Sequence, residues 1–144
     1  MAKTTTVICR DAHQSSLLGT LALAMEAKKA GDEARVVFTS DALYALAGEI
    51  PWSWPEFFRP RATVSMISRN ATKIGYPIGT ERDTRWTDPA RLMAAAQTAG
   101  VRLVACPIWT DILGVTDLPE GVERPDRASY LKALGESSQV IGAL

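Results

Sequence analysis

The chain has 144 residues, of which 47% are hydrophobic and 22% charged, and its sixteen acidic side chains balance its sixteen basic ones. A chain of this length and composition is typical of one globular domain, which we expect to span residues 1–144. The balanced charge gives no net field that favours nucleic acid or an anionic membrane surface, and no apolar run approaches the roughly 20 residues of a membrane-spanning helix.

Cysteine use and the N-terminal sequence indicate a reducing compartment. The chain has two cysteines, and its first residues run straight into a strand-like segment without the apolar core of a signal peptide. We therefore expect a cytoplasmic protein with free thiols. One histidine and two distant cysteines do not form a zinc site, and no glycine-rich phosphate loop follows a strand. No metal, no cofactor, no nucleic-acid partner and no membrane partner is expected.

The N-terminal third predicts a βαβ unit. Residues 4–9 are β-branched and apolar, which favours a first strand. A polar loop leads to a helix over 17–30, capped by Ser15 or Ser16 and ended by Gly31. A second strand over 34–39 and a short helix over 42–47 follow. This alternation indicates a mostly parallel sheet with helices on both faces, so we expect the carboxyl ends of the strands at one edge.

A proline-rich segment over 50–60 interrupts this pattern. Three prolines exclude a regular helix or central strand there. The segment also carries four large aromatic side chains, Trp52, Trp54, Phe57 and Phe58. We predict that they form a contact between subunits of a homo-oligomer, because a monomer seldom exposes so large an apolar patch. Packing over the core of the same chain, or a lid over a pocket, are the alternatives.

The rest of the chain continues the alternation. The expected elements are a helix over 62–74, a loop over 75–86, a helix over 89–99 capped by Asp88, a buried strand over 101–105, a helix over 107–113, a turn over 117–121, a helix over 127–135 and an edge strand over 138–144.

Cys106 lies where the third of these strands ends. Pro107 directly after it suits the first turn of a new helix, so the thiol is predicted at the carboxyl edge of the sheet, at a helix N-terminus. Such a position favours thiolate over thiol, whereas the Asp111 carboxylate nearby opposes it. A small buried hydrophobe is the alternative interpretation of this cysteine.

The polar loop after the first strand opens on the same edge. Arg10, Asp11 and His13 lie there and are candidates for stabilising a thiolate or binding an anionic substrate. Exposed loop residues without a function are the alternative. Cys9 also ends a strand, and core packing is the favoured interpretation, with a redox pair to Cys106 as the other.

Two blocks of sequence resemble the DsrE/DsrF family of sulfur-handling proteins, most closely its DsrE2-like branch. The first block is an alanine-rich helix, a glycine and a strand ending in an aromatic residue and threonine, over residues 23–39. The second runs from residue 92 to Cys106, with Asp111 and Gly114 at the branch's spacing after the cysteine.

The resemblance implies a three-layer, flavodoxin-like α/β fold, an oligomer, and a cysteine, Cys106, that accepts sulfane sulfur as a persulfide. A protein sulfur donor or acceptor is then an expected partner. The chain departs from the branch at Trp109, where the pattern has serine, and at Pro107, and both changes alter the pocket around the sulfur. The sequence thus predicts a sulfur carrier or sulfurtransferase-like protein, with Trp109 and Asp111 beside the thiol. A non-enzymatic binding module with the same fold is the alternative, favoured if Pro107 and Trp109 enclose Cys106.

Overall fold

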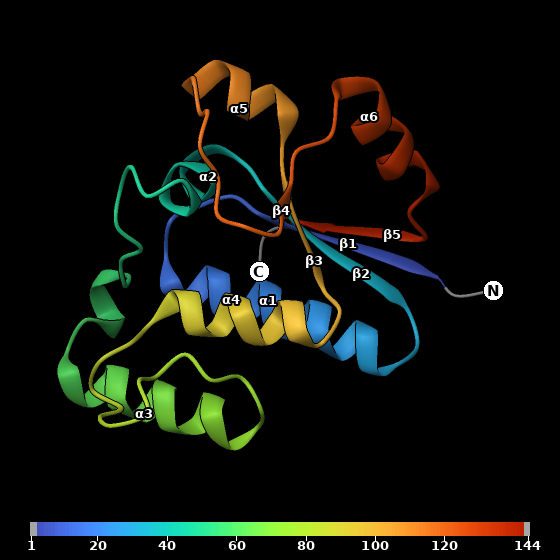
Figure 1. Ribbon diagram of the computed structural model, residues 1–144. Helices are drawn as coiled ribbons and strands as arrows, with labels where there is room; N and C mark the ends of the chain where they lie inside the picture. Colours follow the sequence, from blue (N-terminus) through green and yellow to red (C-terminus); the bar gives the residue numbers. More distant parts are fainter. Residues whose placement is uncertain (1–2, 143–144) are drawn as a thin grey trace.

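A five-stranded parallel sheet forms the centre of the computed structural model, which describes residues 3–142 (Figure 1). The strands lie in the order β4-β3-β2-β1-β5. Their bounds are β1 Thr4–Cys9, β2 Glu33–Phe38, β3 Arg102–Ala105, β4 Val122–Glu123 and β5 Gln139–Gly142. Every neighbouring pair is parallel, which confirms the predicted α/β class.

Helices cover both faces of this sheet. Helices α1 and α4 lie on one face, α2, α5 and α6 lie on the other, and α3 lies beyond α1 and α4 (Figure 1). Their bounds are α1 Gln14–Lys29, α2 Ser40–Leu46, α3 Arg61–Lys73, α4 Pro89–Thr98, α5 Pro107–Leu113 and α6 Arg127–Glu136. In the described part of the chain, no helix is long and apolar enough to cross a membrane.

The predicted elements match these bounds closely, with three differences. Helix α1 begins at Gln14 and its N-cap is His13 rather than Ser15 or Ser16, because the Leu17 N–H already donates to His13 O at 3.0 Å, which places both serines inside the helix. Strand β4 was not predicted, since a two-residue edge strand leaves no periodic pattern. The predicted edge strand over 138–144 is β5, and its last two residues lie outside the described ones.

The carboxyl ends of the three central strands meet at one edge, as predicted. Cys9 pairs with Phe38, and Phe38 pairs with Ala105, so these strands end in register. Because side chains alternate across a sheet, Cys9, Phe38 and Ala105 share the face covered by α1 and α4, while Cys106 belongs to the opposite face. The main core lies on the α1 and α4 side and includes the first three of these residues.

The proline-rich segment packs partly against this core. Trp52 makes an edge-to-face contact with Phe38 at 6.4 Å between ring centroids, and Trp54 is only 9% exposed. Gln14, buried at the start of α1, donates its side-chain amide to Trp52 O at 3.2 Å. Phe57, in contrast, is 86% exposed within the single turn Glu56–Phe58. Most of the Trp54 surface is therefore buried within the same chain. The predicted subunit contact then depends mainly on Phe57 and Phe58, which are exposed.

Candidate functional site

Cys106 is fixed at the junction between β3 and α5. Its backbone N–H donates to Phe38 O at 3.1 Å, and its carbonyl accepts from the Thr110 N–H at 2.9 Å. It is the N-cap residue of α5, and Pro107 is the first helical residue, as the sequence predicts. The residue is only 4% exposed. The cysteine thus occupies the predicted edge, but it is covered.

Tyr130 is the polar side chain at the covered thiol. A small cluster of Val37, Val104 and Cys106 packs against Trp109 and Tyr130, which reaches it from α6. Burial, reinforced by the charge of the neighbouring Cys106 sulfur and by a hydrogen bond to it, raises the pKa of Tyr130 to about 12. The phenol therefore stays protonated at neutral pH, and its side chain packs against the Cys106 cluster.

The two other residues predicted beside the thiol have separate roles. Trp109 is half-buried and packs against both core clusters. The Asp111 carboxylate pairs with the Arg127 guanidinium at 2.6 Å on the surface, so its charge is already compensated. Trp109 packs against the Cys106 cluster and the adjacent Pro107 is buried, which is the arrangement that favours the binding-module interpretation.

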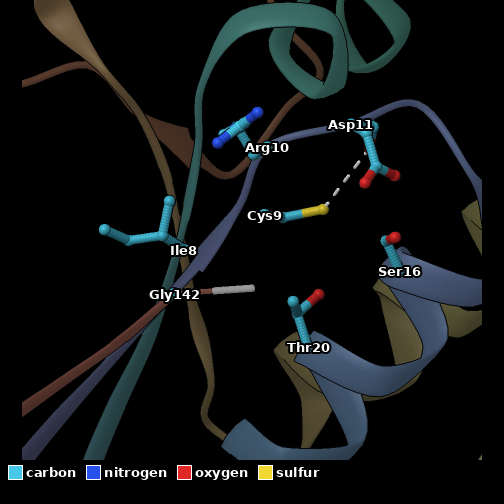
Figure 2. A pocket seen from close by; sticks show the side chains of 7 residues that line it. All are labelled: Ile8, Cys9, Arg10, Asp11, Ser16, Thr20 and Gly142. Atoms are coloured by element: carbon cyan, nitrogen blue, oxygen red, sulfur yellow. Dashed lines mark hydrogen bonds between the residues drawn. The ribbon is translucent and has the colours of Figure 1, made fainter. Parts of the chain in front are cut away.

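A larger pocket, of about 470 Å³, opens at the same edge but around Cys9. Arg10, Asp11, Ser16 and Thr20 are among its lining residues, and Figure 2 shows the Cys9 sulfur pointing toward Asp11. The Cys9 thiol lies 3.9 Å from Asp11 O. Burial raises the pKa of Cys9 to about 12. This thiol is therefore protonated at neutral pH and is a weak nucleophile.

Two of the three loop residues predicted to assist Cys106 lie around Cys9 instead. Arg10 and Asp11 line the Cys9 pocket, and the Asp11 carboxylate accepts the His13 backbone N–H at 3.1 Å. The His13 ring nitrogen Nδ1 is buried and has no hydrogen-bond partner within residues 3–142. A role for these three residues at Cys106 stays a prediction, and the structure brings none of them into the Cys106 cluster.

The two cysteines do not form a redox pair in this fold. Both are free and buried, Cys9 being 1% exposed as the core interpretation predicts. Their strands are separated by β2, about 10 Å across two inter-strand spacings, and their side chains lie on opposite faces of the sheet.

Neither Tyr130 nor the pocket beside it, which contains Arg35 and Arg102, was predicted from the sequence. Tyr130 gave no signal, because it lies 24 positions beyond Cys106 in a weakly patterned helix. The arginines did give a signal, since each is a charged residue three positions before the end of an otherwise mostly apolar strand. Within residues 3–142, no three His, Cys, Asp or Glu side chains gather closely enough to hold a metal ion.

The protein has a three-layer, flavodoxin-like or DsrE-like α/β fold. Among solved structures, the crystal structure of the YchN protein from E. coli is similar, with a TM-score of 0.59 and 17% sequence identity. The match covers 99% of this chain and 100% of the YchN chain. At this identity the likeness shows the fold alone. Neither a family model nor a curated protein sequence matches the chain.

Proposed function

We propose that the protein is a sulfur carrier that accepts sulfane sulfur on Cys106. The observation that supports this most is the placement of the Cys106 thiol at the carboxyl edge of the sheet, as the N-cap of α5, with the phenol of Tyr130 packed against its cluster. A hydrogen bond to an anionic sulfur is stronger than one between neutral groups, so Tyr130 stabilises a thiolate or a persulfide at this position. The resemblance of two sequence blocks to the DsrE/DsrF family supports the same function.

Tyr130 also controls access to the sulfur in this proposal. The thiol is almost fully covered, so a donor reaches it only when Tyr130 moves aside. Helix α6, which carries Tyr130, has no fully buried residue, so the side chain belongs to a weakly anchored element. After transfer, the closed position shields the persulfide from thiols in solution. The terminal sulfur then leaves only when a suitable acceptor meets the open form.

A non-enzymatic binding module is the second candidate, and the enclosure of Cys106 favours it. A cysteine that is 4% exposed and packed by Val37, Val104 and Trp109 has the environment of a small core hydrophobe. In that case the fold would present a surface for a partner and Cys106 would never react under native conditions.

Persulfide formation separates the two candidates. The protein is incubated with inorganic polysulfide, and the peptide containing Cys106 is examined by mass spectrometry. The thiolate attacks a sulfane sulfur, the shortened polysulfide leaves with the electron pair, and the peptide gains one sulfur. Cys106→Ser should lose this gain and Cys9→Ser, the matched control on the opposite face, should keep it. An unmodified Cys106 in folded protein would instead support the binding module.

A further inference from the structure

A small pocket of about 130 Å³ lies between the sheet and α6, next to Tyr130. Arg35 and Arg102 contribute its cationic groups, Glu123 contributes a carboxylate, and Tyr130 forms part of its wall. Tyr130 therefore contacts both the pocket and the Cys106 cluster. The pocket is distinct from the larger one around Cys9, which opens on the opposite face of the sheet.

The charges in and around this pocket leave one cation without a partner. Arg102 is bound by Glu123 through two hydrogen bonds of 2.7 and 2.6 Å. Glu136, the other carboxylate that acts on Arg35, has Lys132 at 4.0 Å. The guanidinium of Arg35 makes no ion pair or hydrogen bond within residues 3–142, although it is half-buried. Its burial, and then the like charge of Arg102, lower the pKa of Arg35. An anion bound there would relieve both effects.

The arginines and the thiol lie along one face of the sheet. The side chains of Arg102, Val104 and Cys106, at every second position of β3 and the residue after it, lie on the same face of the sheet. In the neighbouring strand β2, Arg35 pairs with Arg102. A molecule in the pocket thus lies on the same face as the Cys106 sulfur, and Tyr130 contacts both the pocket and the Cys106 cluster. Movement of Tyr130 would join the pocket to the thiol.

We infer that this pocket binds the sulfur donor of Cys106, and that the donor is a small sulfane-sulfur oxyanion held by Arg35. Thiosulfate is the simplest member of this class. The inference rests on the proposed function and adds the class of its substrate. The Cys106 thiol first loses its proton to water. The thiolate attacks the outer sulfur of thiosulfate, the S–S bond of thiosulfate breaks, and sulfite leaves with the electron pair. A persulfide remains on Cys106, and no external oxidant or reductant is consumed.

Persulfide loading by thiosulfate tests the inference, with Arg35→Gln, Arg35→Lys and Arg69→Gln as variants. We expect Arg35→Gln to raise the thiosulfate concentration for half-maximal loading of Cys106 about tenfold, as loss of a charge-assisted contact does. Arg35→Lys keeps the charge and should restore part of the affinity. Arg69→Gln, an exposed arginine on α3 beyond the opposite face, should match the wild type.

A second measurement tests whether anionic reagents reach Cys106 more readily than neutral ones, and it involves no transfer of sulfane sulfur. The rates of Cys106 modification by neutral methyl methanethiosulfonate and by its anionic sulfonatoethyl analogue are compared. The ratio of anionic to neutral rate should fall several-fold in Arg35→Gln and stay at the wild-type value in Arg69→Gln. Thermal unfolding of each variant confirms that the fold is kept.

The outcomes distinguish this inference from the proposed function. If polysulfide loads Cys106 but thiosulfate does not, or if Arg35→Gln changes neither the loading nor the rate ratio, the inference is wrong and the carrier function stands. If neither donor loads Cys106, the proposed function is wrong, and the substrate class is wrong with it.

Discussion

At the scale of single residues, we predict that the hydroxyl of Tyr130 holds the Cys106 site closed, since this side chain packs against the Cys106 cluster. Replacing Tyr130 with Phe keeps the ring and removes the hydroxyl, and loss of the hydrogen bond that we propose it makes to the Cys106 sulfur would cost about 1 kcal/mol. The open form should become about fivefold more populated, and alkylation of Cys106 by iodoacetamide should accelerate by the same factor. Alkylation that is unchanged or slower in Tyr130→Phe would show that the hydroxyl does not hold the site closed.

The burial of Cys9 leads to a separate prediction about the stability of the protein at high pH. Its pKa is about 12 in the folded protein and 9.0 as the reference value for an unfolded chain. The unfolded state therefore loses this proton first, so stability is complete below pH 9 and is lost as the pH rises toward 12. Between pH 8 and 10, the free energy of unfolding should fall by about 1.4 kcal/mol through Cys9.

The control for this prediction is Cys9→Ala, which should lack that part of the decline. Tyr76 and Tyr130, with pKa values raised to about 12 from 10.0, contribute a loss of the same sign in both proteins. Urea unfolding at the two pH values measures the difference between the two slopes. Equal slopes would mean that the Cys9 thiol is not protected by burial.

At the scale of elements, the caps of two helices offer a matched pair of variants. Asp126 accepts the Ser129 backbone N–H at 2.8 Å at the start of α6, and this bond lowers the pKa of Asp126. Asp88 accepts the Ala90 N–H at 3.2 Å at the start of α4. Loss of either cap costs about 1 kcal/mol.

Only the cap on α6 should affect the thiol. Asp126→Ala loosens the helix that holds Tyr130, so alkylation of Cys106 should accelerate several-fold. Asp88→Ala loosens α4 on the opposite face and should leave that rate unchanged. Equal rates in the two variants would show that α6 does not control access to Cys106.

The elements also show what the sequence could and could not predict. Strand β3 and helix α5 were predictable because an apolar run, a cysteine and a proline determine where one ends and the other begins. The approach of Tyr130 to Cys106 was not, since it depends on how α6 returns across the sheet. The uncompensated charge of Arg35 could not be predicted without the strand register, because it is the register that places Arg35 beside Arg102. Local patterns contain neither relationship.

At the scale of the whole molecule, the exposed aromatic ring of Phe57 is the feature that the isolated chain leaves unexplained. Phe58 beside it is also exposed, and so are Met66 on α3 and Ile74 directly after this helix. We predict that this side of the molecule contacts another copy of the chain. Phe57→Ser should lower the mass measured by light scattering, and Ile112→Ser, an equally conservative loss of exposed apolar surface on α5, should not. Equal masses in all three proteins would contradict the predicted contact.

At the same scale, a sulfur carrier must give up a sulfur from Cys106 as well as accept one there. The most direct measurement is the release of thiocyanate when protein loaded with polysulfide and freed of excess donor is treated with cyanide, which removes the outer sulfur of a persulfide. Wild-type protein should release about one sulfur per loaded chain, return Cys106 to its free thiol and accept sulfur again, whereas Cys106→Ser should release none. Release that is absent from the wild type, or equal in Cys106→Ser, would contradict a sulfur carrier that works through this cysteine.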